Sequence, residues 1–440
     1  MSTPGTLNRD ILRLAVPALG SLIAEPLFLI IDSALVGHLG VVPLAALGVA
    51  SAILQTIVGL MVFLAYSTTP AVARRFGAGD ATRAVSVGID GMWLALGLGA
   101  VLALAGYLGT PLLVGLFGAG PEVTADAEAY LGISMWGLPA MLIVFAATGL
   151  LRGMQDTVTP LWIAGIGFAA NALLNALFIY GLGWGIAGSA TGTVVAQWGM
   201  VAAYVAVIGR LARRHQASVR PQREGVRGSA RSGVWMFLRT VSLRVALLAT
   251  VAVATAFGTQ ELAGWQVAFT MFSTAAFALD ALAIAAQALI GKGLGSGSTR
   301  EVRQVLRRTL AWGVWFGVVV GALIGGLSGW IGMLFTGDAQ VAALVQPALI
   351  VLAVAQPICG VVFVLDGVLI GANDARYLAI AGGLNLVVYV PVLIALSIWH
   401  PGGAAGLAWL AVAFFGVYML ARLATLGWRI RRPQWMTQPA

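Results

Sequence analysis

The chain has 440 residues, of which 60% are hydrophobic and only 9% are Asp, Glu, Lys or Arg. Soluble domains carry about a quarter charged residues, so this composition excludes a water-soluble globular protein. The single cysteine, Cys359, excludes a disulfide framework and a cysteine-based metal site. The three histidines are scattered and show no zinc or haem spacing, so we expect no metal and no bound cofactor.

Twelve apolar stretches follow one another along the chain, separated by short breaks that hold Gly, Pro and Asp. The first, from Ile11 to Val36, is longer than the apolar core of a cleavable signal peptide, so we interpret it as a permanent helix. Stretches of roughly 20 apolar residues are long enough to cross a bilayer. The sequence therefore predicts an all-α polytopic membrane protein with spans at 12–37, 44–70, 86–110, 127–151, 158–182, 186–209, 233–257, 261–290, 308–333, 339–370, 376–399 and 403–427.

The basic residues lie on one side of this predicted topology. All except Arg239 and Arg244 fall at the termini or in alternate loops, with the largest group in the loop after span 6. The opposite loops carry only acids, namely Glu122, Asp126, Glu128, Glu261 and Asp338. The positive-inside rule then places both termini in the cytoplasm. We interpret the net charge of +9 as orientation and attraction to anionic headgroups, with no role in nucleic-acid binding.

The two halves of the chain repeat each other at a constant offset of 218 positions. A single register without gaps indicates a duplication, since accidental matches would not keep it. The matched positions include Leu39-Gly40 with Phe257-Gly258, Leu44-Ala45 with Leu262-Ala263, Gly77 and Gly79 with Gly295 and Gly297, Pro139 with Pro357, Phe145 with Phe363, Asp156 with Asp374, and Gly185 with Gly403.

Each half contains six spans, so both halves enter the membrane from the same side. We therefore predict two six-helix bundles related by a pseudo-two-fold axis along the membrane normal. The predicted parts are an N-terminal lobe at 1–209, a basic cytoplasmic linker at 210–232, and a C-terminal lobe with its tail at 233–440. Parallel repeats of this kind are typical of carriers that bind substrate between or within their halves.

Ionisable residues inside predicted spans mark candidate functional positions, because a charge in the bilayer is costly. Asp32 lies deep in the first span, Glu25 lies two turns earlier on the same face, and Pro26 offers a bend point between them. The repeat mate of Asp32 is Thr250, so only one half carries this acid. Asp32 is either a protonatable coupling site, since burial favours the neutral form of a carboxyl group, or a hydrogen-bonded structural carboxylate.

Two further polar sets have both a structural and a functional interpretation. Asn171 and Asn175 are four residues apart on one helix face, so either could hydrogen-bond Asp32, a ligand or a neighbouring helix. In the second half, we expect an ion pair with a shared proton among Arg244, Asp280 and Asp366.

Several ordered motifs indicate a known family. They are Pro17 in the first span, Ile31–Gly40 (IDSALVGHLG), Arg152–Pro160 (RGMQDTVTP), Leu279–Ala281 with Ala288–Lys292, and Leu365–Gly371 (LDGVLIG). Over nearly its whole length the chain resembles the multidrug and toxic compound extrusion (MATE) family, specifically its bacterial DinF-like branch.

The resemblance implies a V-shaped, monomeric inner-membrane protein of two lobes that is not an enzyme. It implies export of small organic compounds, often cationic and lipophilic, coupled to inward flow of protons or sodium. It also implies that Asp32 is the coupling acid and that Pro17 and Pro26 act as hinges of the first helix. The cavity residues it implies in the N-terminal lobe are Glu25, Tyr130, Thr148, Asn171, Asn175 and Thr193.

Proton and sodium coupling remain the main alternatives for the energy source. Some archaeal relatives carry a second acid where this chain has Asn175, and a sodium ion prefers several oxygen ligands, so the sequence favours protons. We expect alternating access, in which protonation of Asp32 bends the first helix and releases drug. A lipid-linked oligosaccharide flippase of the same superfamily is a rival, but it would need a strongly cationic cavity that Arg244 and Arg239 alone do not supply. An enzyme would need a catalytic constellation that the sequence does not show.

Overall fold

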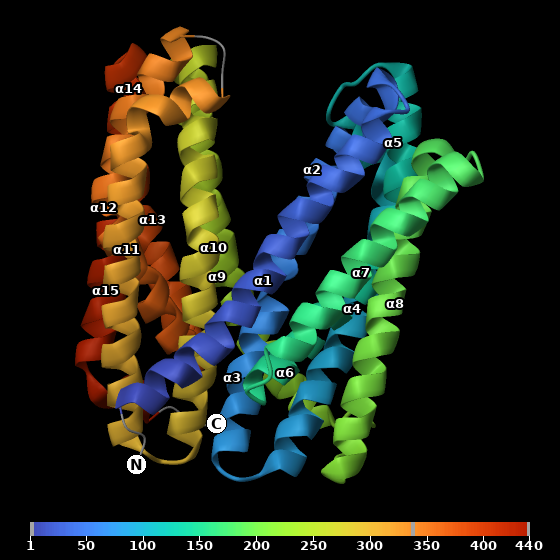
Figure 1. The fold of residues 1–440 in the computed structure, drawn as a ribbon, viewed down its shortest axis with the longest axis vertical. Helices are drawn as coiled ribbons and strands as arrows, with labels where there is room; N and C mark the ends of the chain where they lie inside the picture. The colour runs from blue at the N-terminus through green and yellow to red at the C-terminus, as the bar shows by residue number, and fades with distance from the viewer. Residues whose placement is uncertain (1–3, 336–338, 438–440) are drawn as a thin grey trace. The chain divides into compact units, whose positions relative to one another are not determined.

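The computed structural model describes residues 4–335 and 339–437, so Asp338 lies outside the described residues. Within them, twelve helical spans are long and apolar enough to cross a membrane, which confirms the predicted number (Figure 1). The helices are α1 (Pro4–Gly37), α2 (Val41–Met61), α3 (Phe63–Gly77), α4 (Ala81–Gly115), α5 (Pro121–Ser134), α6 (Leu138–Gly153), α7 (Val158–Ala176), α8 (Gly185–Arg214), α9 (Arg223–Phe257), α10 (Thr259–Gly295), α11 (Thr299–Phe335), α12 (Ala339–Gly371), α13 (Ala375–Trp399), α14 (Gly403–Ala411) and α15 (Met419–Arg431).

Three of the spans consist of two helices with a local change of winding between them. The helices α2 and α3 meet at Val62, and α5 passes into α6 through a 3₁₀ turn at Met135–Gly137. Pro139 follows that turn, and its missing N–H group explains why the α-helical hydrogen bonding is interrupted there. A π-helical segment, Val412–Tyr418, joins α14 to α15, and a shorter one, Leu177–Gly181, extends α7.

The helices extend beyond the apolar stretches at their basic ends. The helix α8 continues to Arg214 and α9 begins at Arg223, so only residues 215–222 of the predicted linker 210–232 lie outside these helices. Hydropathy detects the part of a helix that lies in the bilayer, whereas arginine is a good helix former and lets a helix continue into water. The segment between the two halves is therefore mostly helical.

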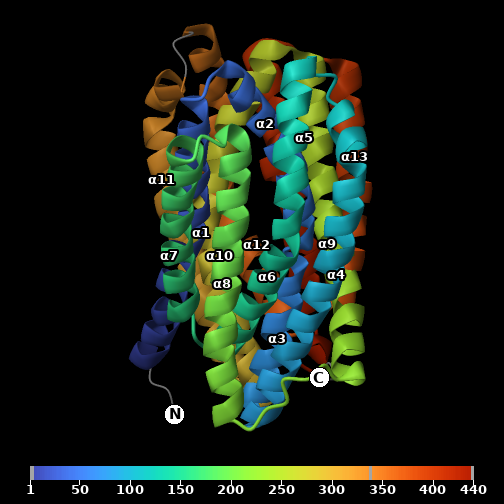
Figure 2. The same cartoon turned by 90° about the vertical axis from the view of Figure 1, so that its right-hand side faces the viewer.

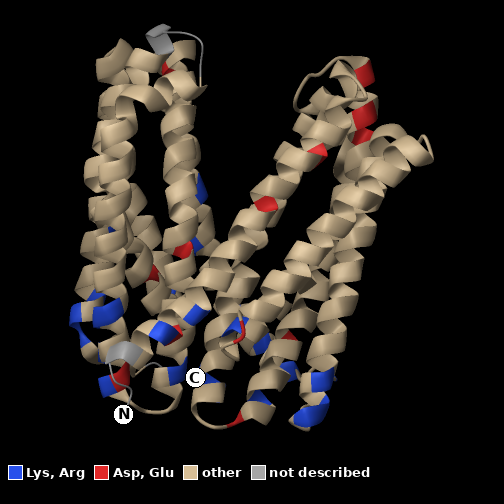
Figure 3. Cartoon of the chain, in the orientation of Figure 1, with Lys and Arg blue, Asp and Glu red and all other residues tan. Residues whose placement is uncertain are grey.

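The chain divides into two compact units. The N-terminal unit is Val16–Gly233, and the C-terminal unit comprises the residues up to Ala15 together with those from Val234 onward. The first turns of α1 therefore belong to the C-terminal unit, whereas the rest of α1 belongs to the N-terminal unit. In each unit, Lys and Arg concentrate at one end of the helices (Figure 3).

The backbone repeats at the same offset of 218 positions as the sequence. Four pairs of equivalent residues have positive φ angles of similar size: Gly40 (131°) and Gly258 (146°), Gly79 (81°) and Gly297 (70°), Gln155 (67°) and Asn373 (58°), and Gly185 (57°) and Gly403 (64°). Three pairs lie in short connections between helices, and the fourth, Gly185 and Gly403, begins the helices α8 and α14. Equivalent turns in both halves are therefore built with the same backbone conformation.

Small residues allow the helices to pack closely. A Cβ atom placed on Gly360 of α12 would lie 2.1 Å from the backbone oxygen of Gly313 on α11. Gly317 and Gly321 continue this contact at four-residue intervals along α11. Close backbone approach through such a stripe is the usual way for helices to associate without a hydrophobic driving force.

Candidate functional site

The candidate site is formed where α1 packs along α7 within the N-terminal unit. A Cβ atom on Gly20 would lie 2.8 Å from Leu161 Cδ1, and the rings of Phe28 and Phe168 stack with centroids 5.3 Å apart. Further along both helices, the Tyr180 hydroxyl donates to the backbone oxygen of Leu35 at 2.6 Å. The two helices therefore run in the same direction and hold Asp32 against α7.

Asp32 is the buried acid of this contact, with 4% of its surface exposed. Its Oδ1 accepts hydrogen bonds from Asn175 Nδ2 and from Ser189 Oγ, both at 2.7 Å. The Tyr130 hydroxyl of α5 lies near enough to this carboxyl group to interact with it. Helices α1, α5, α7 and α8 thus converge on a single carboxyl group.

All of these donors are neutral. Among residues 4–335 and 339–437, no basic side chain forms an ion pair with Asp32. A carboxylate accepts hydrogen bonds only, whereas a protonated carboxyl group also donates one. Hydroxyl and amide groups can serve either form, so the arrangement accommodates Asp32 with or without its proton.

Asn175 links Asp32 to α8. Its Nδ2 lies 3.5 Å from Ser189 Oγ and from Thr193 Oγ1, so Thr193 joins the cluster through the amide. A Cβ atom on Gly192 would lie 2.2 Å from Asn175 Oδ1, so the absence of a side chain at 192 makes room for the amide. Asn175 Oδ1 is itself buried without a hydrogen-bond partner in the described residues, and it could accept a hydrogen bond from a ligand or a protonated carboxyl group.

The structure separates three residues that the sequence grouped with Asp32. Asn171 is buried, but within the described chain it makes no hydrogen bond to Asp32. Thr148 lies on α6, where its hydroxyl is 2.8 Å from that of Tyr204 on α8. Glu25 is exposed, two turns before Asp32 on α1.

Sequence reasoning missed two residues that the structure makes prominent. Ser189 donates directly to Asp32, and it lies one turn before Thr193 on the same face of α8, a spacing that could have indicated it. Asp90 on α4 is 1% exposed, and its Oδ1 accepts from the backbone N–H of Gln222 at 2.8 Å. Asp90 was overlooked because it lies near the start of a span, close to the basic loop.

The charged set of the C-terminal unit differs from the one predicted. Asp366 pairs with Arg239 and Arg422, and its Oδ2 lies 3.3 Å from Arg422 Nη2. Arg244 is exposed instead, and Asp280 is half-buried on α10, so the predicted ion pair of Arg244 with Asp366 is wrong. Arg422 lies inside the predicted span 403–427 although the sequence groups it with the basic residues of the terminus, and its buried guanidinium group belongs to the unit.

A fold of twelve membrane-spanning helices in two repeated halves, with a carboxyl group buried among neutral donors, defines a membrane transport protein rather than an enzyme. The model of the MatE family matches this chain twice, at residues 17–177 and 236–394. The chain belongs to the MatE family, whose members are transporters. The two matches also fall on the two repeated halves.

Similar proteins include Protein DETOXIFICATION 44, chloroplastic, of Arabidopsis thaliana, which is 29% identical over 97% of this chain and 82% of its own length. DNA damage-inducible protein F of Escherichia coli is 27% identical over 96% of this chain and 92% of its own. Multidrug resistance protein MdtK of Edwardsiella ictaluri is 28% identical over 84% of this chain and 82% of its own.

Solved structures show the same fold. The Vibrio cholerae MATE transporter VcmN in its bent form superimposes with a TM-score of 0.88, with 21% identity and 99% of each chain covered. A MOP superfamily transporter from Pyrococcus furiosus gives a TM-score of 0.86, with 22% identity over 98% of this chain and 97% of the other.

Proposed function

We propose that the protein exports small organic, cationic compounds in exchange for protons, by alternating access, and that Asp32 is the protonation and coupling site. The observation that carries this proposal is the surrounding of Asp32, which is buried, accepts hydrogen bonds from the neutral groups of Asn175 and Ser189, and has no ion pair within the described residues. The name of one similar protein, Multidrug resistance protein MdtK, supports drugs as the substrate class.

The proposed cycle begins with a proton from outside neutralising Asp32. The hydrogen bonds from Asn175 Nδ2 and Ser189 Oγ to the carboxylate then weaken, because a neutral acceptor attracts donors less than a charged one. Helix α1 bends near Pro17 or Pro26, where the proline rings remove helical hydrogen bonds. The bend contracts the cavity and expels the drug, and Asp32 later releases its proton to the cytoplasm.

Two features support a bend in this helix. Ser21 Oγ hydrogen-bonds the backbone oxygen of Pro17 at 3.2 Å, a back-bond that often accompanies bent helices. Related MATE transporters, at 22% identity, are described in a straight and in a bent conformation. The same residue, Asp32, also offers a carboxylate to a cationic drug, so drug and proton would compete for it.

The remaining features of the proposal concern location and assembly. We place the protein in the bacterial cytoplasmic membrane with both termini in the cytoplasm, because its basic residues gather at the ends of the helices next to the termini (Figure 3). We propose a monomer, because the duplication supplies both halves of a carrier within one chain.

The proposal is tested by reconstituting the protein in liposomes and following efflux of a fluorescent cationic dye under an imposed pH gradient without sodium. Asp32→Asn should abolish gradient-driven efflux, whereas Glu122→Gln, which alters an exposed acid on α5, should not. If efflux requires a sodium gradient, the coupling ion is sodium and not the proton. Proton-driven efflux that persists in a folded Asp32→Asn protein would move the coupling acid elsewhere.

A further inference from the structure

We infer that the basic end of α11, in the C-terminal unit, binds an anionic phospholipid, with its phosphate on Arg300, Arg303 and Arg307. Membrane orientation and a general attraction to anionic headgroups account for basic loops without any particular arrangement of the side chains. Four features distinguish the arrangement on α11. They are the spacing of the arginines along the helix, their lack of protein partners, the hollow that they line, and the apolar surface that follows them.

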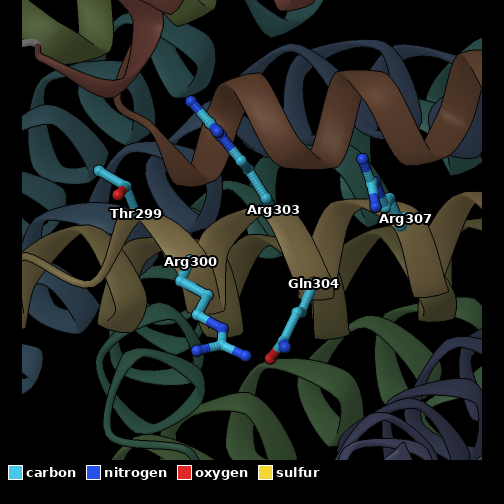
Figure 4. A pocket seen from close by; sticks show the side chains of 5 residues that line it. All are labelled: Thr299, Arg300, Arg303, Gln304 and Arg307. Carbon is cyan, nitrogen blue, oxygen red and sulfur yellow. The ribbon is translucent and has the colours of Figure 1, made fainter.

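The backbone positions of the three arginines lie on one face of the helix, from which their side chains spread to both sides (Figure 4). They follow one another at intervals of three and four residues, so they line one side at a pitch of 3.6 residues per turn. Gln304 belongs to the same face, whereas Glu301 points about 100° away from Arg300 and leaves this face without an acid. The basic face therefore carries three positive charges along two turns.

None of these three guanidinium groups is engaged by the protein in the part of the chain that the structure describes. Their neighbour Arg308 differs, because its Nε donates to Asn8 Oδ1 at 2.5 Å, and Trp312 Nε1 reaches the same oxygen at 3.2 Å. Arg308 thus anchors the beginning of α1, whereas Arg300, Arg303 and Arg307 remain available to a ligand.

The available arginines surround a hollow. It measures about 330 Å³ and is lined by Thr299, Arg300, Arg303, Gln304 and Arg307. Figure 4 shows Arg303 and Arg307 extending to one side of α11, whereas Arg300 and Gln304 extend to the other side. A phosphate beside Arg303 and Arg307 would accept charge-assisted hydrogen bonds from two guanidinium groups, and Arg300 would add a third positive charge at the same turn of the helix.

The same helix continues into a surface suited to the rest of a lipid. The next hollow, about 210 Å³, is lined by Arg308, Ala311, Trp312 and Trp315. The two tryptophan rings meet edge to face at 5.9 Å, and Trp315 is 59% exposed. Beyond it, the exposed side chains are apolar, as at Val318. A basic turn, an aromatic turn and an apolar face in this order match the phosphate, ester region and acyl chains of a phospholipid.

The experiment uses the full-length protein, stripped of lipid in detergent and titrated while bound lipids are counted by native mass spectrometry. Phosphatidylglycerol is compared with phosphatidylcholine of the same acyl chains, and with soluble glycerol phosphate. We expect phosphatidylglycerol to bind more tightly than phosphatidylcholine, and glycerol phosphate not to compete. Each arginine contributes about fivefold, so Arg300→Gln, Arg303→Gln and Arg307→Gln together should weaken one site about a hundredfold.

The matched control removes three charges from the corresponding end of α8, with Arg210→Gln, Arg213→Gln and Arg214→Gln. These residues are also exposed and lie at the end of the helix, with successive spacings of three residues and one residue. An equal loss of phosphatidylglycerol in both triple variants would reduce the effect to net charge and overturn the proposal. Unchanged binding in the α11 variant, or equal binding of phosphatidylcholine, would overturn it too. If glycerol phosphate competes with phosphatidylglycerol at similar concentrations, the site recognises phosphate without the acyl chains, and the proposal of a lipid site is overturned. Unaltered melting temperatures of both variants establish that they are folded.

Discussion

The hydroxyl groups of Thr148 and Tyr204 lie 2.8 Å apart in the N-terminal unit, and the offset of 218 positions maps them onto Asp366 and Arg422. Asp366 and Arg422 are in contact as well, with 3.3 Å between Oδ2 and Nη2. Both halves therefore keep a polar contact between the same pair of spans. Its chemistry is neutral in one half and ionic in the other.

In a second pair of equivalent contacts, the neutral contact and the acid-containing contact are exchanged between the halves. Thr250 and Tyr389 share a hydrogen bond of 2.6 Å in the C-terminal unit, and their repeat mates are Asp32 and Asn171. Here the C-terminal unit is neutral and the N-terminal unit holds the acid, which is bonded to Asn175 one turn beyond Asn171. Each half thus combines one neutral contact with one acid-containing cluster, at exchanged positions. This exchange explains how a symmetric fold can support different roles for its halves.

The ionic cluster of the C-terminal unit should contribute strongly to stability. In Asp366→Thr, the carboxylate is lost and Arg239 and Arg422 are left as two buried cations. Removing one partner of a buried ion pair costs about 3–5 kcal/mol, so the melting temperature in detergent should fall markedly. The double variant Asp366→Thr with Arg422→Tyr copies the neutral pair of the other half and removes one cation. It should recover part of the lost stability.

The comparison for these variants is the neutral pair itself. Thr148→Val with Tyr204→Phe deletes one hydrogen bond and should cost only about 1 kcal/mol. If Asp366→Thr melts no lower than this variant, the ion pairs of Asp366 do not stabilise the fold. A double variant less stable than Asp366→Thr alone would show that the equivalence of the two contacts does not extend to their energetics.

Gly192 should be essential for the Asp32 cluster. In Gly192→Ala, the new Cβ atom would meet Asn175 Oδ1 at 2.2 Å and the backbone N of Asn175 at 3.0 Å. The amide must move and its 2.7 Å hydrogen bond to Asp32 is lost. A hydrogen bond to a charged group is worth about 1.5–3 kcal/mol, so transport should fall about tenfold or more.

Gly199→Ala, on the same helix, is the matched control because its Cβ atom would meet nothing within 4 Å. Dye efflux from liposomes measures both variants, after their expression and melting temperatures have been compared. Equal transport by Gly192→Ala and Gly199→Ala would contradict the role given to Asn175. Equal loss in both would point to a general effect of alanine in α8.

The sequence predicts the number of spans and singles out Asp32, and both predictions have physical reasons. Hydropathy over some 20 residues averages out local noise, and an acid within such a stretch is rare enough to stand out, as Asp32 does. The partners of an acid are harder to predict. Ser189 resembles any other membrane serine until α8 is packed against α1. Arg422 lies close to the other arginines at the basic end of its span, so the sequence does not show that its side chain is buried. Pairings across helices depend on rotations about helix axes that periodicity alone does not give.

Asp90 should fasten the segment that connects the two halves, residues 215–222, to the N-terminal unit. Its carboxylate accepts from the N–H of Gln222, just before α9 begins, where a negative charge also faces the positive end of the helix dipole. Two further bonds fasten the same segment, from Trp93 Nε1 to the Val219 oxygen at 3.0 Å and from Thr82 Oγ1 to the His215 oxygen at 2.7 Å. In Asp90→Ala, residues 215–222 should detach and trypsin should cleave there faster.

Asp90→Ala should weaken the attachment of residues 215–222 by about 1.5–3 kcal/mol, because the backbone N–H of Gln222 loses a hydrogen bond to a charged group. Limited proteolysis followed by mass spectrometry locates and times the cleavage after Arg214 or Arg223, which flank the segment; Arg220 precedes Pro221, where trypsin does not cut. Trp93→Phe should change the rate in the same direction, but by less, and Glu122→Gln should not change it. Cleavage of Asp90→Ala at the wild-type rate would show that the carboxylate does not secure the connection.

Pro26 should act as a hinge of α1. In Pro26→Ala, the residue regains an N–H group and its helical hydrogen bond, which favours the straight helix by about 3 kcal/mol. A bias of that size shifts a two-state equilibrium by about two orders of magnitude, so bent conformers should nearly disappear. Dye binding should persist while efflux slows, because the Asp32 cluster itself is unchanged.

Pro43→Ala is the control, since Pro43 lies in the first turn of α2, where an N–H group has no helical partner in any case. Efflux by Pro26→Ala at the rate of Pro43→Ala would place the bend elsewhere, and Pro17→Ala would then be the variant that slows transport.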